Sequence, residues 1–142
     1  MNLWRLDCGA QTILVGGDEN LAEVFYWGAL LPESENLKSI WNITRLDYSG
    51  GVLDGVPALS ICPEVSKTFN GHPGMRIRGA SGKRLYPNFR LTNAKLSKTS
   101  LLLEYEDPEI GLTYKANFRA HKETSVFELS ASLTANTDIL VD

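Results

Sequence analysis

The feature that most constrains the fold is an alternation of apolar and polar residues between Glu109 and His121. Every second position is apolar, at Leu112, Tyr114, Ala116, Phe118 and Ala120. A period of two is typical of a β-strand with one buried face and one solvated face. A second alternating stretch follows from Val126 to Thr134. These two neighbouring stretches predict a chain that builds β-sheet.

Short strands separated by turn-forming residues recur along the sequence. We expect strands at 21–27, 75–79, 89–98, 100–106, 110–120 and 126–134, and a last strand that begins near Ile139. The first fifteen residues alternate around a turn at Gly9-Ala10, with inward positions predicted at Leu3, Cys8, Ile13 and Val15. Residues 32–41 predict one helix of one or two turns, with capping residues between Glu33 and Asn36. Short strands with turn signals every ~8 to 12 residues predict an all-β fold, an antiparallel β-sandwich.

Length and composition fit a single domain over residues 1–142. The chain has 43% hydrophobic residues, 22% charged residues and a net charge of -3, an ordinary globular composition. It lacks the basic character that nucleic-acid binding requires, an apolar run of the ~20 residues that span a bilayer, and a recognisable signal peptide. Cys8 and Cys62 are interpreted as reduced core residues, with a disulfide between them as the alternative. The sequence therefore predicts a cytoplasmic protein that binds neither nucleic acid nor membrane.

Few residues suggest catalysis. There is no Gly-x-Ser-x-Gly motif, and His72 and His121 are interpreted as surface residues without the acidic neighbours that a zinc site needs. The densest acidic group flanks Pro108 and is interpreted as a solvated turn; it consists of Glu104, Glu106, Asp107 and Glu109. No catalytic residue, metal ligand or cofactor is assigned from these patterns.

Residues 42–74 form a long irregular stretch that is rich in Gly and Pro, and such stretches are often functional. Asp47 and Asp54 lie in it, where each carboxylate either caps a turn or approaches a ligand's hydroxyl groups. A group of aromatic residues also has two interpretations, as packing in the core or as a platform for stacking sugars. Its members are Phe25, Tyr26, Trp27, Trp41 and Tyr48.

Three segments, taken in order, resemble one enzyme family. The segment "EVFYWGALLPE" (Glu23 to Glu33) resembles the "YWG-x-x-L" signature of the α-galactosidases called melibiases, glycoside hydrolase family 36. The segment "YSGGVLDGVPAL" (Tyr48 to Leu59) resembles their Gly-rich segment, and "LEYEDPEIGLTYKANFRAHKETSVFELSASLTAN" (Leu103 to Asn136) is similar to their "D-x-x-x-G-L" turn and strand pair. The resemblance therefore covers nearly the whole chain.

The resemblance implies that these residues form the N-terminal domain of a larger enzyme. Family members begin with a large β-sandwich, a supersandwich of the galactose-mutarotase type, followed by a catalytic (β/α)8 barrel. Two aspartates of the barrel perform retaining hydrolysis, and neither would lie within these 142 residues. We therefore expect the N-terminal fragment of a longer chain; the apolar "ILV" run just before Asp142 is consistent with this expectation.

The resemblance also implies partners and one substrate-binding residue. Family members commonly form homo-oligomers, and a loop of the N-terminal domain can reach a neighbouring subunit's active site. Asp54 matches the loop aspartate that accepts a hydrogen bond from a sugar hydroxyl. Here the sequence departs from the family, because Gly55-Val56 replaces the usual aromatic-Arg pair and Pro57 comes one residue early.

Three functional hypotheses follow. The first is an accessory domain of an α-galactosidase that acts in folding, in oligomerisation and in shaping the substrate pocket. The second is a stand-alone carbohydrate-binding module with Trp27, Trp41 and Tyr48 as its platform. The third is a β-sandwich that serves only for protein contacts.

Overall fold

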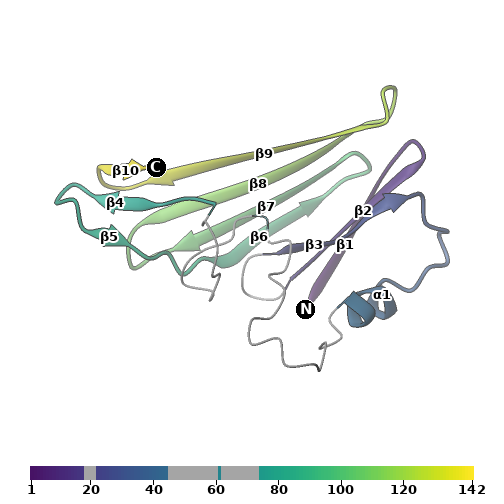
Figure 1. Ribbon diagram of the computed structural model, residues 1–142, viewed down its shortest axis with the longest axis horizontal. Coiled ribbons are helices and arrows are strands. Elements are labelled where there is room, and N and C mark those ends of the chain that lie inside the picture. The colour runs from purple at the N-terminus through teal and green to yellow at the C-terminus, as the bar shows by residue number, and fades with distance from the viewer. Residues whose placement is uncertain (18–21, 45–60, 62–73) are drawn as a thin grey trace, which may run out of the picture.

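The computed structural model describes residues 1–17, 22–44, 61 and 74–142, which form an antiparallel β-fold with one short helix (Figure 1). The described strands form three sheets, in the orders β1-β2-β3, β6-β7-β8-β9 and β10-β4-β5. The elements are β1 (Asn2–Cys8), β2 (Gln11–Gly17), β3 (Glu23–Ala29), α1 (Leu37–Thr44), β4 (Ile77–Gly79), β5 (Arg84–Leu85), β6 (Arg90–Leu96), β7 (Ser100–Asp107), β8 (Leu112–His121), β9 (Val126–Ala135) and β10 (Ile139–Val141). No helix in these ranges is long and apolar enough to cross a membrane.

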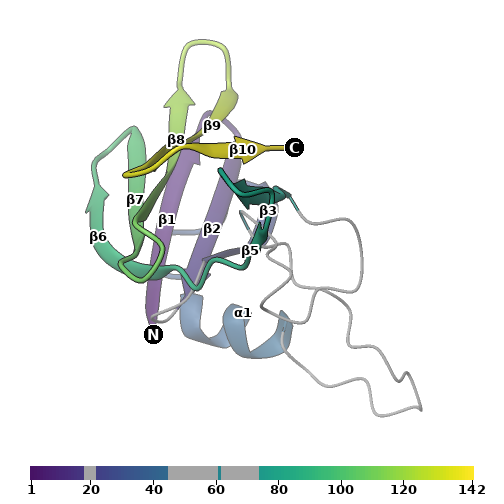
Figure 2. The same cartoon turned by 90° about the vertical axis from the view of Figure 1, so that its left-hand side faces the viewer.

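The core lies between the three-stranded sheet β1-β2-β3 and the four-stranded sheet β6-β7-β8-β9. β1 packs across β7 and β8, as Figure 2 shows. The alternating positions of β7 and β8 provide one side of the core, and β1 and β2 provide the other. Its buried members include Leu6, Cys8, Ile13, Val15, Leu101, Leu103, Tyr105, Leu112, Tyr114, Ala116, Phe118 and Ala120.

One tyrosine forms a hydrogen bond between the four-stranded sheet and the residue just before β3. Tyr105 in β7 is fully buried, and its hydroxyl oxygen accepts a hydrogen bond of 3.0 Å from the backbone N–H of Ala22, just before β3. Burial raises the pKa of Tyr105 to about 12, because the apolar surroundings disfavour the phenolate. The side chain therefore stays neutral and satisfies a backbone donor that would otherwise be buried without a partner.

β2 is buried on both faces because the polypeptide after β3 covers its outer side. On that side the Thr12 hydroxyl donates to the Asp7 carboxylate at 2.6 Å and accepts from the Leu31 N–H at 3.1 Å. Arg5 donates to the same carboxylate and to the carbonyl oxygens of Leu31 and Pro32. These bonds satisfy the buried Thr12 hydroxyl and hold residues 30–32 against the sheet.

Helix α1 extends this cover. Asn36 caps its N-terminus, because its side-chain oxygen accepts hydrogen bonds from the N–H groups of Lys38 and Ser39. Trp41 packs edge-on against Phe25 with ring centroids 5.1 Å apart. A Cβ atom at Gly16 would lie 2.4 Å from the Trp41 ring, so the absence of a side chain at Gly16 makes room for the indole.

The all-β class and its short helix are confirmed, and most of the expected strands are present. Cys8, Ile13 and Val15 lie in the core as predicted. The inward position predicted at Leu3 was wrong, because its side chain lies with Gly16 and Trp41 on the outer face of the sheet, where it is half-buried. The helix begins at Leu37 and continues to Thr44, three residues beyond its predicted end. β5 lies in a segment that the sequence analysis predicts as a turn. Only two of its residues pair with β4, and so short a strand shows no alternation of apolar and polar residues. β10 is present and pairs with β4.

Candidate functional site

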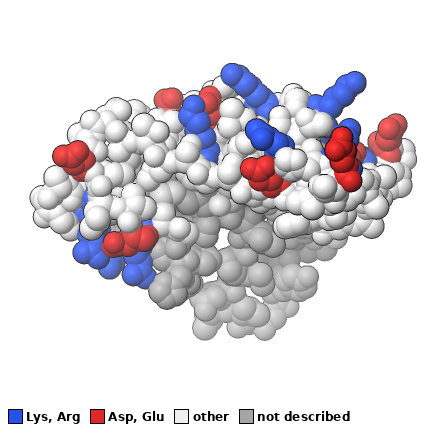
Figure 3. All heavy atoms as spheres, turned by 90° about the horizontal axis from the view of Figure 1, so that it is seen from above, with Lys and Arg blue, Asp and Glu red and all other residues white. Residues whose placement is uncertain are grey.

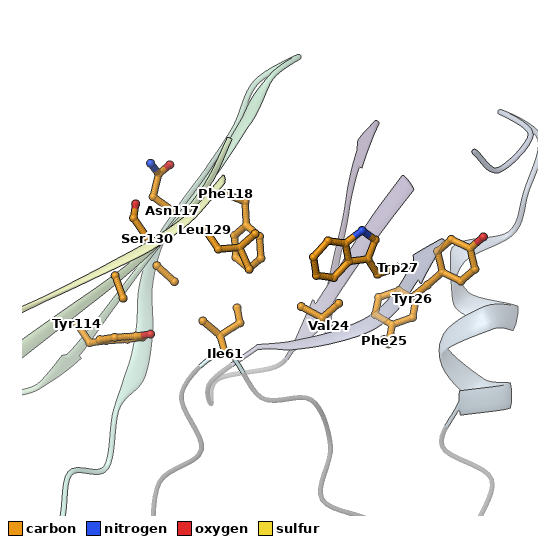
Figure 4. A pocket seen from close by; sticks show the side chains of 12 residues that line it. Val24, Phe25, Tyr26, Trp27, Ile61, Tyr114, Asn117, Phe118, Leu129 and Ser130 are labelled. Atoms are coloured by element: carbon orange, nitrogen blue, oxygen red, sulfur yellow. The ribbon is translucent and has the colours of Figure 1, made fainter. Parts of the chain in front are cut away.

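Among the described residues, an apolar groove lies between β3 and β9, which are the edge strands of their sheets (Figure 4). It has a volume of about 410 Å³. Val24 and Trp27 line it from β3, and Phe118 and Leu129 line it from β8 and β9. Ile61 lies between the two sides in Figure 4. The groove thus continues the hydrophobic core to the surface.

The polar side chains beside the groove do not converge on it. Asn117 and Ser130 are cross-strand partners on the outer face of the sheet, and Figure 4 shows both pointing away from Phe118 and Leu129. A sugar site needs polar groups placed to bind hydroxyls. The described lining is therefore better suited to apolar groups than to a carbohydrate.

The Tyr-Trp-Gly segment has a structural explanation. The Tyr26 hydroxyl donates to the carbonyl oxygen of Ala29 at 2.8 Å, and a Cβ atom at Gly28 would lie 2.9 Å from that hydroxyl. The Trp27 indole N–H donates to the Gln11 side-chain oxygen at 3.2 Å. These contacts shape the end of β3, and they leave Trp27 58% exposed at the groove.

The predicted sugar-stacking platform does not form among the described residues. Trp41 is only 8% exposed and packs on Phe25, so its faces are not available to a sugar. Trp27 points into the groove on the other side of its strand from Tyr26. Tyr48, the third proposed member, lies outside the described residues. For Phe25 and Trp41 the packing interpretation is confirmed.

The acidic group around Pro108 is solvated only in part. Glu106 and Glu109 are exposed as predicted, but Asp107 is 4% exposed. The Asp107 carboxylate accepts backbone hydrogen bonds from Asn88 at 2.7 Å, Glu109 at 3.0 Å and Ile110 at 3.3 Å. It therefore holds the β7–β8 turn together, and Gly111 completes the turn at a φ of 66°. The prediction of a solvated Asp107 was wrong, because a turn carboxylate can bond inward to its own loop.

Two other carboxylates form ion pairs on the outer face of the sheet. Glu104 lies 2.6 Å from the Lys115 ammonium and accepts a bond from Asn93 at 2.7 Å. Its pKa is lowered first by the Lys115 hydrogen bond and then by that of Asn93. His121 is exposed as predicted and lies 2.8 Å from Glu128, which lowers the pKa of Glu128. Neither pair faces the groove.

Several candidate residues lie outside the described ranges. They are the substrate-binding candidate Asp54, together with Asp47, Cys62 and His72. Cys8 is buried with a free thiol, which hydrogen-bonds to the Val126 carbonyl at 3.5 Å. Within the described ranges, no group of three or more His, Cys, Asp or Glu residues could hold a metal ion.

Charged side chains of both signs are interspersed on the face shown in Figure 3. A nucleic-acid-binding surface gathers Lys and Arg in one patch or stripe. The mixed pattern on this face agrees with the small net charge of -3.

These observations define an antiparallel β-sandwich with an open apolar groove and, among its described residues, no cluster typical of catalysis. No protein-family model matches the chain, and no curated protein matches it. Two solved structures do share its fold. Both are crystal structures of GH36 α-galactosidase AgaA from Geobacillus stearothermophilus.

The two similarities cover nearly all of this chain but only a part of the enzyme. A doubly substituted form in complex with raffinose matches with a TM-score of 0.74 and 14% identity, over 99% of this chain and 23% of that chain. The other AgaA structure matches with a TM-score of 0.67 and 15% identity, over 96% of this chain and 22% of that chain. At such low identity the similarity establishes the fold, and it confirms the fold that the sequence resemblance implies. The chain spans about a quarter of the length of these neighbours.

Proposed function

We propose that this chain is the N-terminal β-sandwich domain of an α-galactosidase and supports a catalytic barrel supplied by the polypeptide that follows it. The observation that carries the proposal is the fold match over 99% of this chain and only 23% of a GH36 α-galactosidase. The ordered Tyr-Trp-Gly, Gly-rich and Asp-Pro-x-x-Gly-Leu segments add support from the sequence. In this role the domain stabilises the enzyme and contributes to its oligomerisation, and it needs no cofactor.

The experiment compares the 142-residue chain with the full reading frame. We expect the chain alone to release no galactose from raffinose or from p-nitrophenyl α-galactoside, and the longer protein to hydrolyse both. Circular dichroism shows whether the chain alone is folded β-structure. Hydrolysis by the folded chain alone, or a longer protein that is inactive on every α-galactoside, would refute the proposal.

Asp54 is the proposed contact with substrate. Its carboxylate would accept a hydrogen bond from a galactose hydroxyl in the oligomeric enzyme. We expect Asp54→Asn in the full-length enzyme to raise KM more than it lowers kcat, because the barrel's reacting groups are unchanged. Asp47→Asn is the matched control from the same segment. Equal kinetics for the two variants and the unsubstituted enzyme would remove Asp54 from the site.

The alternative of a stand-alone carbohydrate-binding module receives less support. Of its three proposed platform residues, Trp41 is buried and Trp27 is exposed. We expect calorimetry of the 142-residue chain with raffinose or melibiose to give no binding heat. A saturable heat that is lost in Trp27→Ala would favour the module instead.

A further inference from the structure

The inner face of β9 continues the hydrophobic core, but its middle, at Leu129 and Ala131, stays exposed, whereas Phe127, Leu133 and Ala135 are partly buried against the core. Its apolar residues stand opposite buried residues of β8, and Leu129 stands opposite Phe118. Phe118 is 1% exposed and Leu129 is 48% exposed. The whole inner row of β9 is Phe127, Leu129, Ala131, Leu133 and Ala135. The sequence thus builds a core-facing surface beyond the point where the other sheet ends.

On the opposite side of the groove, β3 also has an exposed apolar residue opposite a buried residue of the neighbouring strand. Trp27 pairs with Ile13 in β2, and Ile13 is fully buried whereas Trp27 is 58% exposed. The rings of Trp27 and Phe127 meet edge-on across the open end, with centroids 6.3 Å apart. Both edge strands therefore present apolar inner faces to one groove.

The two edges of the four-stranded sheet differ in how they are protected against further pairing. β6 carries Arg90 and Lys95 and has an irregular register between Leu91 and Asn93. β9 is ten residues long, pairs regularly with β8, and has Glu128 as its one charged residue. Charges and bulges block the addition of strands, and long apolar edges favour it.

We propose that β9 and the groove form a strand-addition site for an extended segment of the polypeptide that follows residue 142. The segment would extend the sheet beyond β9 and place apolar side chains from alternate positions in the groove. This inference rests on the proposed function, under which most of the protein lies outside this chain, as the 23% coverage of the AgaA chain suggests. The 410 Å³ groove and its apolar lining fit such side chains.

Hydrogen exchange on the full reading frame and on the 142-residue chain tests the site. In the 142-residue chain we expect the alternate backbone amides of β6 and β9 that point away from the neighbouring strand to exchange rapidly. In the full-length protein we expect exchange of the outward-pointing amides of residues 126–135 to slow about tenfold or more, because a new strand accepts hydrogen bonds from these N–H groups. Residues 90–96 of β6 are the internal control, and their exchange should not change.

A matched pair of variants separates the two edges. Ala94, Leu103, Ala116 and Ala131 form one row across the inner face of the sheet, and the outer two alanines lie exposed on β6 and β9. In the full-length protein we expect Ala131→Lys to abolish the protection of 126–135, and Ala94→Lys to leave it unchanged. Both variants should leave the 142-residue chain folded.

The outcomes also distinguish this inference from the proposed function. Equal exchange of β9 in the long and short proteins would overturn the strand addition, even if the long protein hydrolyses α-galactosides. Protection of β9 in an inactive long protein would support the strand addition and refute the enzymatic role. Protection that appears in the 142-residue chain as its concentration rises would overturn the proposal in favour of a second copy as the occupant.

Discussion

β2 and β9 are both apolar strands with little charge, yet they end in opposite environments. Six of the seven residues of β2 are buried, and most residues of β9 are exposed. β2 lies between two strands, with the core on one face and residues 30–44 on the other, whereas β9 is the last described strand of its sheet and its inner face is only partly buried. The difference indicates that the sequence of a strand determines its extended backbone and which side chains face inward, whereas the burial of those side chains depends on what packs against that face.

The sharpest test of this comparison uses two leucines on either side of Phe118. Leu101 and Leu129 both pair with Phe118 across the sheet, but they are 1% and 48% exposed. We expect Leu101→Ala to lower the free energy of unfolding by about 2–5 kcal/mol, because it leaves a cavity in the core. Leu129→Ala should cost below about 1 kcal/mol. Urea denaturation of the 142-residue chain at low concentration measures both, and equal losses would show that β9 is already covered.

The next largest effect tests the cover over β2. A methyl group at Gly16 would meet the Trp41 ring, so we expect Gly16→Ala to destabilise the chain by about 1–3 kcal/mol through overpacking. Gly79→Ala is the control, since its Cβ would lie 3.9 Å from the Leu85 side chain, in ordinary contact. Thermal denaturation compares the two. If Gly16→Ala proves neutral, then Trp41 does not pack firmly against β2.

A loss of the same order is expected at the Tyr105 hydroxyl group, which links β7 to the residue just before β3. Tyr105→Phe keeps the buried ring but leaves the Ala22 N–H without its acceptor. We expect a loss of about 1–3 kcal/mol, the usual cost of an unsatisfied buried donor. Tyr86→Phe is the exposed control. Faster amide exchange at Ala22 in the Tyr105 variant alone would locate the effect, and unchanged exchange would contradict it.

The sequence predicts elements whose pattern is local and misses those that depend on distant partners. The β8 alternation and the Asn36 cap are visible in a few consecutive residues, and both are confirmed. β5 has two residues and exists through its pairing with β4. The inward turn of Asp107 depends on the Asn88 backbone, nineteen residues away.

The groove likewise could not be predicted from local sequence pattern alone. The period of β9 predicts which side chains face inward, but it cannot show that β9 ends its sheet or that the opposite sheet stops short. The exposed state of Leu129 and Trp27 follows from that topology. A candidate site made by the edges of two sheets is therefore recognised only once the strand order is known.

The smallest predicted effect concerns the outer face of β9, where Glu128 contacts His121. The hydrogen bond from His121 lowers the pKa of Glu128 below its ordinary value of 4.5, so the folded chain binds this proton less readily than the unfolded chain. The stabilisation is therefore present above pH 4.5 and is lost as the pH falls through the lowered pKa. Because both side chains are exposed, solvent screening keeps the contribution small.

Carbon-detected NMR titration of the glutamate side chains measures this pKa directly. We expect His121→Ala, which removes the hydrogen-bond donor, to raise the pKa of Glu128 and to leave that of Glu104 unchanged, because Glu104 bonds to Lys115 and Asn93 instead. Lys115→Met should raise the pKa of Glu104 alone. A His121 variant that shifts both carboxyl groups would mean that the two pairs share one electrostatic network, and that the outer face of β9 is less independent of β7 than its separate contacts indicate.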